Sequence, residues 1–288
     1  VVVTIIGKPN VGKSSLMNKM IGEKIAIVSA RPQTTRNRVM GVLTGENDQI
    51  VFLDTPGRHD PRTRLGEYMM QSVHDALEGM DAVLLILDVS HVTEQDYDIA
   101  EKATKYKVPK IVALNKIDIV TPEKILSVTS KIAEIGYEEI IPVSAKTGEG
   151  VDDLINSLKK HLSEGPKYFP EDMITDQPER ILCAEMIREK ALRHLHDEVP
   201  HGIGVEIIKI TALSDRLTQI DATVYCERDA HKRIIIGKQG SMLQAIGKEA
   251  RMDIEKLLAT DVNLKLWVKV RPDWRNNQSD LKALGYQS

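Results

Sequence analysis

The sequence has few cysteines and lacks long apolar runs. Its 288 residues include only two cysteines, Cys183 and Cys226, which lack the spacing of metal ligands. Neither a disulfide-framed scaffold nor a structural zinc site is therefore expected. The longest apolar stretches, 1–6 and 82–87, are far shorter than the ~18 residues that span a bilayer. We expect a protein of the reducing cytoplasm whose contact with any membrane is peripheral.

Aromatic residues and net positive charge are also scarce. Aromatics make up 4% of the chain and include two phenylalanines, which argues against RNA recognition by a sheet of stacked rings. The net charge of −3 argues against a protein coated with positive charge. Basic residues nevertheless gather near one end: residues 228–275 hold eleven Lys or Arg against six Asp or Glu, a local excess of five.

The length suggests two domains of about 150 residues each. Residues 1–164 alternate short apolar runs with amphipathic stretches, which predicts an α/β domain with a doubly wound, mostly parallel sheet. Residues 165–178 contain three prolines and are interpreted as a linker. Residues 179–288 follow the order α-β-β-α-α-β, which predicts a smaller α+β domain with its C-terminal tail. Expected strands lie at 1–6, 39–43 (a polar edge strand), 49–53, 82–87, 110–114 and 139–142, and expected helices at 13–21, 66–77, 94–106, 122–135, 151–161 and 179–195.

A phosphate-binding motif, G-x-x-x-x-G-K-[ST], lies directly between the first expected strand and helix. Its residues, with the one that follows, are Gly7, Lys8, Pro9, Asn10, Val11, Gly12, Lys13, Ser14 and Ser15. Glycines let backbone N–H groups converge on phosphates, Lys13 reaches the β- and γ-phosphates, and the Ser14 hydroxyl ligates Mg²⁺. A dinucleotide-binding fold is excluded here because G-x-G-x-x-G is absent.

Three further motifs follow expected strands, where an open α/β sheet binds ligands. They are Asp54-Thr55-Pro56-Gly57, Asn115-Lys116-Ile117-Asp118 and Ser144-Ala145-Lys146. Asp54 suits a metal reached through water, and Gly57 suits a γ-phosphate. The Asp118 carboxylate accepts two hydrogen bonds, which matches N1–H and N2–H₂ of guanine and mismatches adenine. Asn115 would bridge base and loop, Lys116 would lie along the purine, and the Ala145 N–H would meet guanine O6.

These elements in this order resemble the translation-factor-like GTPases. In such enzymes a threonine of a polar switch loop supplies a second Mg²⁺ ligand. Here residues 29–38 form that loop, and of Thr34 and Thr35 we choose Thr35. Arg58 follows Gly57 where Ras-like enzymes place a water-orienting glutamine, which predicts slow intrinsic hydrolysis. We expect Lys13, Thr35 and Gly57 to act in catalysis.

Asn10 adds a hypothesis about a second cation. In related GTPases that carry P-N-V-G-K-S, an asparagine at this position helps to hold a potassium ion that replaces an arginine finger. The resemblance therefore implies K⁺ as a further cofactor beside Mg²⁺.

The basic end contains a second short motif before an amphipathic helix. Ile236, Gly237, Lys238, Gln239 and Gly240 form a G-x-x-G loop that resembles the loop of a KH domain, which clamps about four nucleotides of single-stranded nucleic acid. We expect these five residues to bind RNA.

The combination of motifs resembles the Era-like GTPase family, bacterial GTPases with a C-terminal type II KH domain. The resemblance implies binding of GTP and GDP, slow GTP hydrolysis, binding of the 3′ end of small-subunit ribosomal RNA, a role in assembly of that subunit, and some peripheral association with the inner membrane. We expect a monomer. An alternative stays open: a GTPase adaptor whose KH-like domain binds protein in place of RNA.

Overall fold

The computed structural model describes residues 1–31, 33–56, 63–137 and 139–286. The chain forms two compact units. The first holds Val1–Ala26, Thr35–His59 and Met70–Asp176, and the second holds Ile27–Thr34, Asp60–Met69 and Gln177–Ser288. Two short segments of the first half thus belong with the C-terminal half, which the sequence did not indicate. The exact domain limits given above stay a prediction.

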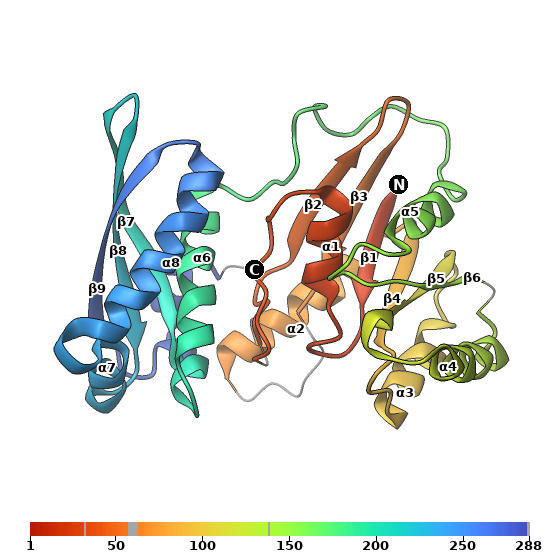
Figure 1. Cartoon of the computed structure of the whole chain (residues 1–288), viewed down its shortest axis with the longest axis horizontal. Coiled ribbons are helices and arrows are strands. Elements are labelled where there is room, and N and C mark those ends of the chain that lie inside the picture. Colours follow the sequence, from red (N-terminus) through yellow and green to blue (C-terminus); the bar gives the residue numbers. More distant parts are fainter. Residues whose placement is uncertain (32, 57–62, 138, 287–288) are drawn as a thin grey trace. The chain divides into compact units, whose positions relative to one another are not determined.

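The first unit is built on a six-stranded sheet in the order β2-β3-β1-β4-β5-β6 (Figure 1). Only β2 runs antiparallel, and it pairs with β3. The strands are β1 (Val2–Ile6), β2 (Val39–Thr44), β3 (Gln49–Asp54), β4 (Ala82–Asp88), β5 (Lys110–Asn115) and β6 (Glu139–Pro142). The carboxyl ends of β1, β3, β4, β5 and β6 therefore lie along one edge of the sheet, where parallel strands place a ligand site.

Helices cover both faces of this sheet, which explains why its strands are continuously apolar. Alternate residues of β4 enter different cores: Leu84 and Ile86 pack with α1 and α5, while Val83 and Leu85 pack with α3 and α4. The helices are α1 (Lys13–Ile21), α2 (Arg64–Leu77), α3 (Glu94–Ala103), α4 (Pro122–Ile135) and α5 (Val151–Lys159). The predicted doubly wound, mostly parallel sheet is confirmed. Helix α3 stops three residues earlier than the expected Tyr106, because Thr104 caps it through an N–H bond to the Glu101 carbonyl.

The proline-rich segment lies along the edge strand β2. The N–H of Val42 donates to the carbonyl of Ile174 at 2.8 Å, and Phe169 and Met173 pack against the core that includes Met40. The residues expected to form a linker therefore cover the free edge of the sheet, which a β-strand otherwise leaves open to pairing with another chain. Strand β2 is consequently more buried than the polar edge strand expected from the sequence.

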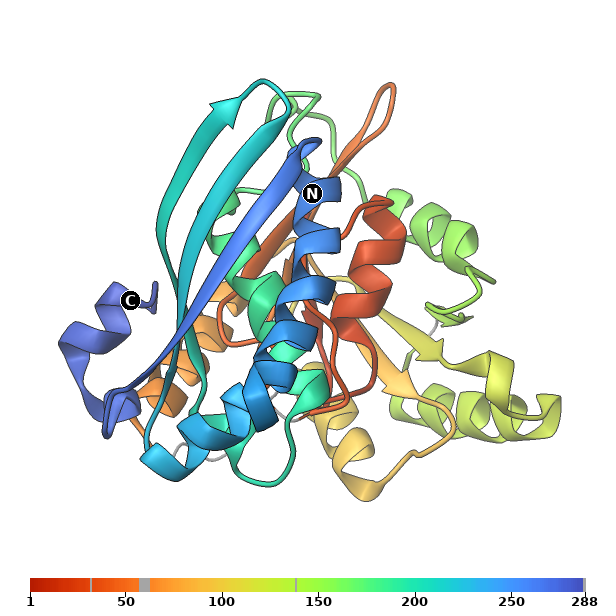
Figure 2. The ribbon, with the colours of Figure 1, turned by 60° about the vertical axis from the view of Figure 1, so that its left-hand side comes forward.

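The C-terminal residues of the second unit form a three-stranded sheet in the order β7-β8-β9, with β7 and β8 antiparallel and β8 and β9 parallel. Helices α6 and α8 pack on one face of it (Figure 2). The elements are α6 (Glu179–His194), β7 (Gly204–Ser214), β8 (Leu217–Cys226), α7 (Asp229–Ile236), α8 (Ser241–Leu258), β9 (Asp261–Val270) and α9 (Gln278–Ala283). This confirms the predicted α+β order. Among the helices of the described ranges, none is both long enough and apolar enough to cross a bilayer.

Candidate nucleotide site and nucleic-acid interface

The phosphate loop between β1 and α1 is shaped by two glycines and by a distant asparagine. A Cβ on Gly12, at φ 99°, would lie 2.2 Å from Nδ2 of Asn115, and a Cβ on Gly7, at φ 152°, would lie 2.6 Å from the Ile86 carbonyl oxygen. Asn115 Nδ2 donates to the Val11 carbonyl at 2.9 Å. The loop and the end of β5 are therefore in direct contact, so the phosphate and base parts of the site form one surface.

A hydroxyl and a carboxylate meet beside this loop. Ser14 Oγ donates to Asp54 Oδ2 at 2.5 Å and lies 3.0 Å from Thr35 Oγ1. The other carboxylate oxygen, Asp54 Oδ1, is buried without a hydrogen-bond partner among the described residues. Two hydroxyls and an incompletely satisfied carboxylate are the hard oxygen ligands that Mg²⁺ prefers. The donor set therefore fits a magnesium ion.

The charges of Lys13 and Asp54 are buried and only partly compensated. Burial lowers the pKa of Lys13, opposed by the attraction of Asp54. Burial likewise raises the pKa of Asp54, opposed by Lys13 and by the hydrogen bond from Ser14. Lys13 Nζ donates to the carbonyls of Gly7 at 3.2 Å and Lys8 at 2.8 Å, which are neutral partners. A phosphate at Lys13 and a cation at Asp54 would each relieve this cost.

The hydroxyls of the two switch threonines have different hydrogen-bond partners. Thr34 Oγ1 donates to the Arg31 carbonyl at 2.6 Å, whereas the Thr35 hydroxyl lies beside Ser14. Thr55, at the end of β3, is buried and donates to the Ile5 carbonyl at 2.9 Å. Gly57, Arg58 and His59 lie outside the described residues.

Two hydrogen bonds connect the base-binding candidates that follow β5 with those that follow β6. The Ala145 N–H donates to Asn115 Oδ1 at 3.0 Å, and Ser144 Oγ donates to Asp118 Oδ1 at 2.8 Å. Ser144 is fully buried, while Asp118 and Lys146 are exposed. Asp118 is thus oriented from beneath by Ser144 and keeps its carboxylate accessible to a ligand.

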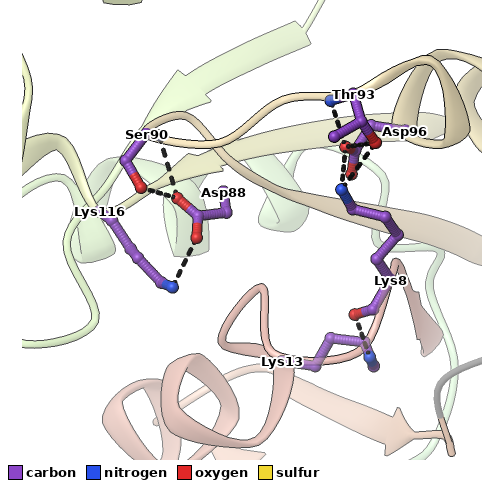
Figure 3. A network of polar contacts seen from close by, with 7 residues as sticks. All are labelled: Lys8, Lys13, Asp88, Ser90, Thr93, Asp96 and Lys116. Carbon is purple, nitrogen blue, oxygen red and sulfur yellow. Dashed lines mark hydrogen bonds and ion pairs between the residues drawn. The ribbon is translucent and has the colours of Figure 1, made fainter. Parts of the chain in front are cut away.

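Sequence reasoning missed Asp88, at the end of β4, which holds the lysine of the base site (Figure 3). Lys116 Nζ donates to Asp88 Oδ2 at 2.6 Å and to the Asn10 carbonyl at 3.1 Å. Partial burial raises the pKa of Asp88, but hydrogen bonds from Lys116 and Ser90 outweigh it, and the net shift is downward. Asp88 follows an apolar strand as Asp54 does, so the same signal was present in the sequence.

A second missed contact ties the phosphate loop to α3 (Figure 3). Lys8 Nζ lies 2.5 Å from Asp96 Oδ2 and 2.9 Å from Thr93 Oγ1. Asp96 is fully buried and also accepts the Thr93 N–H at 2.8 Å, so one carboxylate caps the helix and fixes the loop. The T-x-x-D spacing was a visible capping signal, but nothing local to it indicated Lys8.

The G-x-x-G loop joins α7 to α8 and depends on positive φ angles. Gly237 (φ 75°), Gln239 (φ 53°) and Gly240 (φ 79°) all adopt them. A Cβ on Gly237 would lie 2.6 Å from Cβ of Met242, whereas one on Gly240 would meet open space. Ile236 packs partly against the core, and Lys238 and its neighbours precede the N-terminus of α8, whose dipole favours phosphate.

A groove of ≈ 760 Å³ continues from this loop between α8 and β9. Its sides combine apolar and basic groups: Leu243, Lys248, Arg251, Leu264 and Leu266 all line it. Apolar surface suits the faces of unpaired bases, and basic side chains suit the phosphates that join them. Lys248 and Arg251 were not selected from the sequence, although their spacing of three places them on one side of a helix.

Two sequence families match the chain. Residues 2–116 match the family described as 50S ribosome-binding GTPase, and residues 198–275 match the KH domain. GTPase Era of Ruminiclostridium cellulolyticum is 46% identical, with 99% of this chain and 97% of the relative aligned. GTPase Era of Alkaliphilus metalliredigens is 51% identical, with 99% and 98% aligned.

Two crystal structures are similar over the whole chain. Era in complex with MgGDPNP and nucleotides 1506–1542 of 16S ribosomal RNA has a TM-score of 0.94 at 40% identity and covers 100% of this chain and 98% of its own. A variant of Aquifex aeolicus Era bound to GDP·AlF₄⁻ has a TM-score of 0.94 at 40% identity, with coverage of 100% and 99%.

Fold, site and matched families define a GTPase with a nucleotide-binding α/β domain and a KH domain. The similarity to the Era relatives defines the family more narrowly than this class, because it extends over nearly the full length of the chain and of those relatives. The chain belongs to the Era family of GTPases.

Proposed function

We propose that this GTPase is a switch that binds the 3′ end of small-subunit ribosomal RNA through its KH domain and assists assembly of that subunit. The observation that supports this most directly is the groove beside the G-x-x-G loop, with Lys248 and Arg251 on its lining. The related Era bound to nucleotides 1506–1542 of 16S ribosomal RNA supports the choice of RNA. The same chemistry favours RNA over a protein partner.

We propose Mg²⁺ as the cofactor of hydrolysis, held by Ser14, Thr35 and Asp54. When bound, the ion neutralises charge on the β- and γ-phosphate oxygens. Lys13 would exchange the carbonyls of Gly7 and Lys8 for those oxygens, which restores a charged partner to a buried ammonium. The backbone N–H groups of the phosphate loop and the dipole of α1 hold the phosphates in place.

The guanine base lies between the side chains that follow β5 and β6. Asp118 would accept N1–H and N2–H₂, and Lys116 would cover one face of the purine. The Ala145 N–H, which donates to Asn115 Oδ1 at 3.0 Å in the structure, would donate to O6 when the base is bound. Asn115 supports the site from below, because its Nδ2 donates to the Val11 carbonyl. Nucleotide selectivity is therefore built from hydrogen bonds that adenine cannot make.

The affinity for RNA should depend on which nucleotide is bound. Wild-type protein should bind an oligonucleotide of the 16S 3′ end at least ~5-fold more tightly with a non-hydrolysable GTP analogue than with GDP, the lower end of typical allosteric coupling. Fluorescence anisotropy at constant salt measures both Kd values. Equal Kd values would contradict a nucleotide-controlled switch, and absence of binding in both states would contradict the RNA function itself.

We propose K⁺ as a second cofactor, held with the help of Asn10. Asn10 has a positive φ of 66° and its carbonyl accepts Lys116 Nζ, so the phosphate loop presents a fixed asparagine at its turn. Hydrolysis should be at least about tenfold faster in KCl than in NaCl at equal ionic strength, which corresponds to about 1.4 kcal/mol of transition-state stabilisation. Asn10→Ala should abolish the difference. Equal rates of wild-type protein in both salts, followed by phosphate release, would eliminate the potassium proposal.

We propose that the protein acts in the cytoplasm, where its ribosomal RNA partner is. Peripheral association with the inner membrane stays a prediction from the family resemblance, as does the monomeric state.

A further inference from the structure

Part of the predicted switch loop is attached to the helix that opens the KH half. Residues 27–34 belong to the same compact unit as α6. Three hydrogen bonds fasten them to that helix and its C-terminal residue: Val28 N–H to Glu189 Oε1 at 2.8 Å, Arg31 Nη2 to the Leu195 carbonyl at 2.9 Å, and Arg188 Nη2 to the Thr34 carbonyl. The segment is thus held at its beginning, middle and end.

Among these partners, Arg188 carries a buried positive charge. Its side chain is 1% exposed, and Nε and Nη2 donate to the Glu185 carboxylate at 2.8 and 2.7 Å. Burial lowers the pKa of Arg188, but the Glu185 carboxylate more than offsets it and the net shift is upward, so the buried guanidinium stays charged. A buried charge needs all the hydrogen bonds it can make. The Thr34 carbonyl supplies one that Glu185 does not.

The peptide bond between Thr34 and Thr35 joins the two compact units. On one side of it the Thr35 hydroxyl lies 3.0 Å from Ser14, within the ligand set that fits Mg²⁺. On the other side the Thr34 carbonyl belongs to that peptide group itself and accepts from Arg188. A rotation of this peptide that moves Thr35 relative to Ser14 must also move the oxygen that Arg188 binds.

Two further side chains of α6, Lys190 and His194, contact α8, the helix that lines the groove. Lys190 Nζ lies 2.8 Å from Glu189 Oε2 and 2.7 Å from Asp253 Oδ2 on α8. His194 Nε2 lies 2.8 Å from Glu249 Oε1, also on α8. Helix α8 lines the groove beside the G-x-x-G loop. A set of polar contacts therefore runs from the Val28 N–H of the switch segment through Glu189 and Lys190 to the helix that would contact RNA. Arg188, which holds the Thr34 carbonyl, is the neighbour of Glu189 along α6.

We propose that Arg188 is a positioning residue for the magnesium site. Its hydrogen bond to the Thr34 carbonyl fixes the position of Thr35. Because α6 contacts α8, which would bind RNA, that position depends on whether RNA is bound. The inference rests on the proposed function. A residue outside the nucleotide-binding unit thereby determines how well the GTP state is formed. In the GDP state, which has no γ-phosphate for the switch threonine to serve, Arg188 contributes little to nucleotide or metal binding.

The test uses the full chain with Arg188→Lys, which keeps a charge for Glu185 but has a single nitrogen, and Arg188→Met, which has none. Lys209→Gln is the matched control, because Lys209 is an exposed basic residue of β7 in the same unit and takes no part in the contacts named above. We expect both Arg188 variants to reduce the ratio of RNA Kd values between GDP and the GTP analogue towards one, with the GDP-state Kd unchanged. The control should keep the wild-type ratio.

A Mg²⁺ titration of the nucleotide complexes separates positioning from general damage. Arg188→Lys should raise the Mg²⁺ concentration for half-saturation about fivefold or more with the GTP analogue and leave the GDP complex unchanged. Equal shifts in both complexes, or none in either, would overturn the inference. Equal RNA affinities of wild-type protein in the two states would instead remove the coupling of the proposed function, and the Mg²⁺ titration would still decide whether Arg188 positions Thr35. If Arg188→Met does not fold, the lysine variant alone suffices for both measurements.

Discussion

The double variant Lys238→Asp/Gln239→Asp should bind the ribosomal 3′-end oligonucleotide at least about 100-fold more weakly than wild-type protein, a loss of about 2.7 kcal/mol. The variant removes one positive charge and places two negative charges on a loop that we expect to touch phosphates. Binding of nucleic acid depends strongly on such charges and on salt. GTP hydrolysis without RNA should stay within about twofold of wild type, because neither residue belongs to the nucleotide site.

This variant is a sharper test than replacement of the glycines. A side chain at Gly237 would collide with Met242, so loss of RNA binding there would also follow from a displaced helix α8. Gln239 has a φ of 53°, a conformation in which aspartate is several-fold enriched. The loop backbone should therefore survive the substitution, and a thermal unfolding curve close to that of wild type verifies this.

The control is Lys105→Asp/Lys107→Asp, which changes net charge by more but at exposed residues of the other unit. It should leave RNA affinity within about threefold. If the loop variant binds RNA as wild type does, the groove is no RNA site, and a protein-binding adaptor becomes the better description. Anisotropy titrations of the three proteins at one salt concentration decide between these outcomes.

The sequence predicted those residues of the nucleotide site that belong to local motifs. Gly12, Lys13 and Ser14 follow a strand and begin a helix. The chemistry of phosphate and Mg²⁺ binding explains these residue types without reference to distant residues. The same holds for Asp54 and Asn115, which follow apolar strands. Because the carboxyl ends of parallel strands lie along one edge of a sheet, the sequence alone assigns these separate motifs to one site.

Contacts between distant residues were beyond this reasoning. Lys8 is a variable position of its motif, and its partner Asp96 is indicated by the sequence only as a helix cap. Lys116 was expected along the purine, and its bond to Asp88 was not foreseen. In each case the pairing depends on how one loop packs beside another, which no local pattern contains.

Helix α6 shows the limit most clearly. Its apolar residues, among them Ile187 and Ala191, recur at helical spacing and are buried in the core. The consecutive charges Arg188, Glu189 and Lys190 would ordinarily indicate a solvated face. They are buried instead, because the folded chain brings partners near. The switch segment supplies backbone partners to Arg188 and Glu189, and Asp253 of α8 pairs with Lys190.

Asp118→Asn should change the base that the protein selects. The carboxylate accepts from both N1–H and N2–H₂ of guanine, whereas an asparagine accepts one bond and turns its own N–H₂ towards the guanine amino group. Loss of charged hydrogen bonds worth about 1.5–3 kcal/mol each should weaken GTP binding by roughly 100- to 1,000-fold. Competition with a fluorescent guanine nucleotide measures this change.

The same variant should gain affinity for xanthosine triphosphate, and this gain distinguishes recognition from damage. Xanthine keeps N1–H and has a carbonyl in place of the amino group, so the asparagine can accept from the first and donate to the second. Ser144 Oγ, which donates to Asp118 Oδ1 at 2.8 Å, finds an acceptor in the asparagine oxygen too, so the side chain keeps its orientation. Asp98→Asn, an exposed carboxylate on α3, should leave both affinities unchanged. If Asp118→Asn lost GTP without gaining xanthosine triphosphate while its unfolding temperature stayed that of wild type, Asp118 would not read the purine edge, and guanine selectivity would have to come from the backbone N–H of Ala145 and the side chain of Asn115.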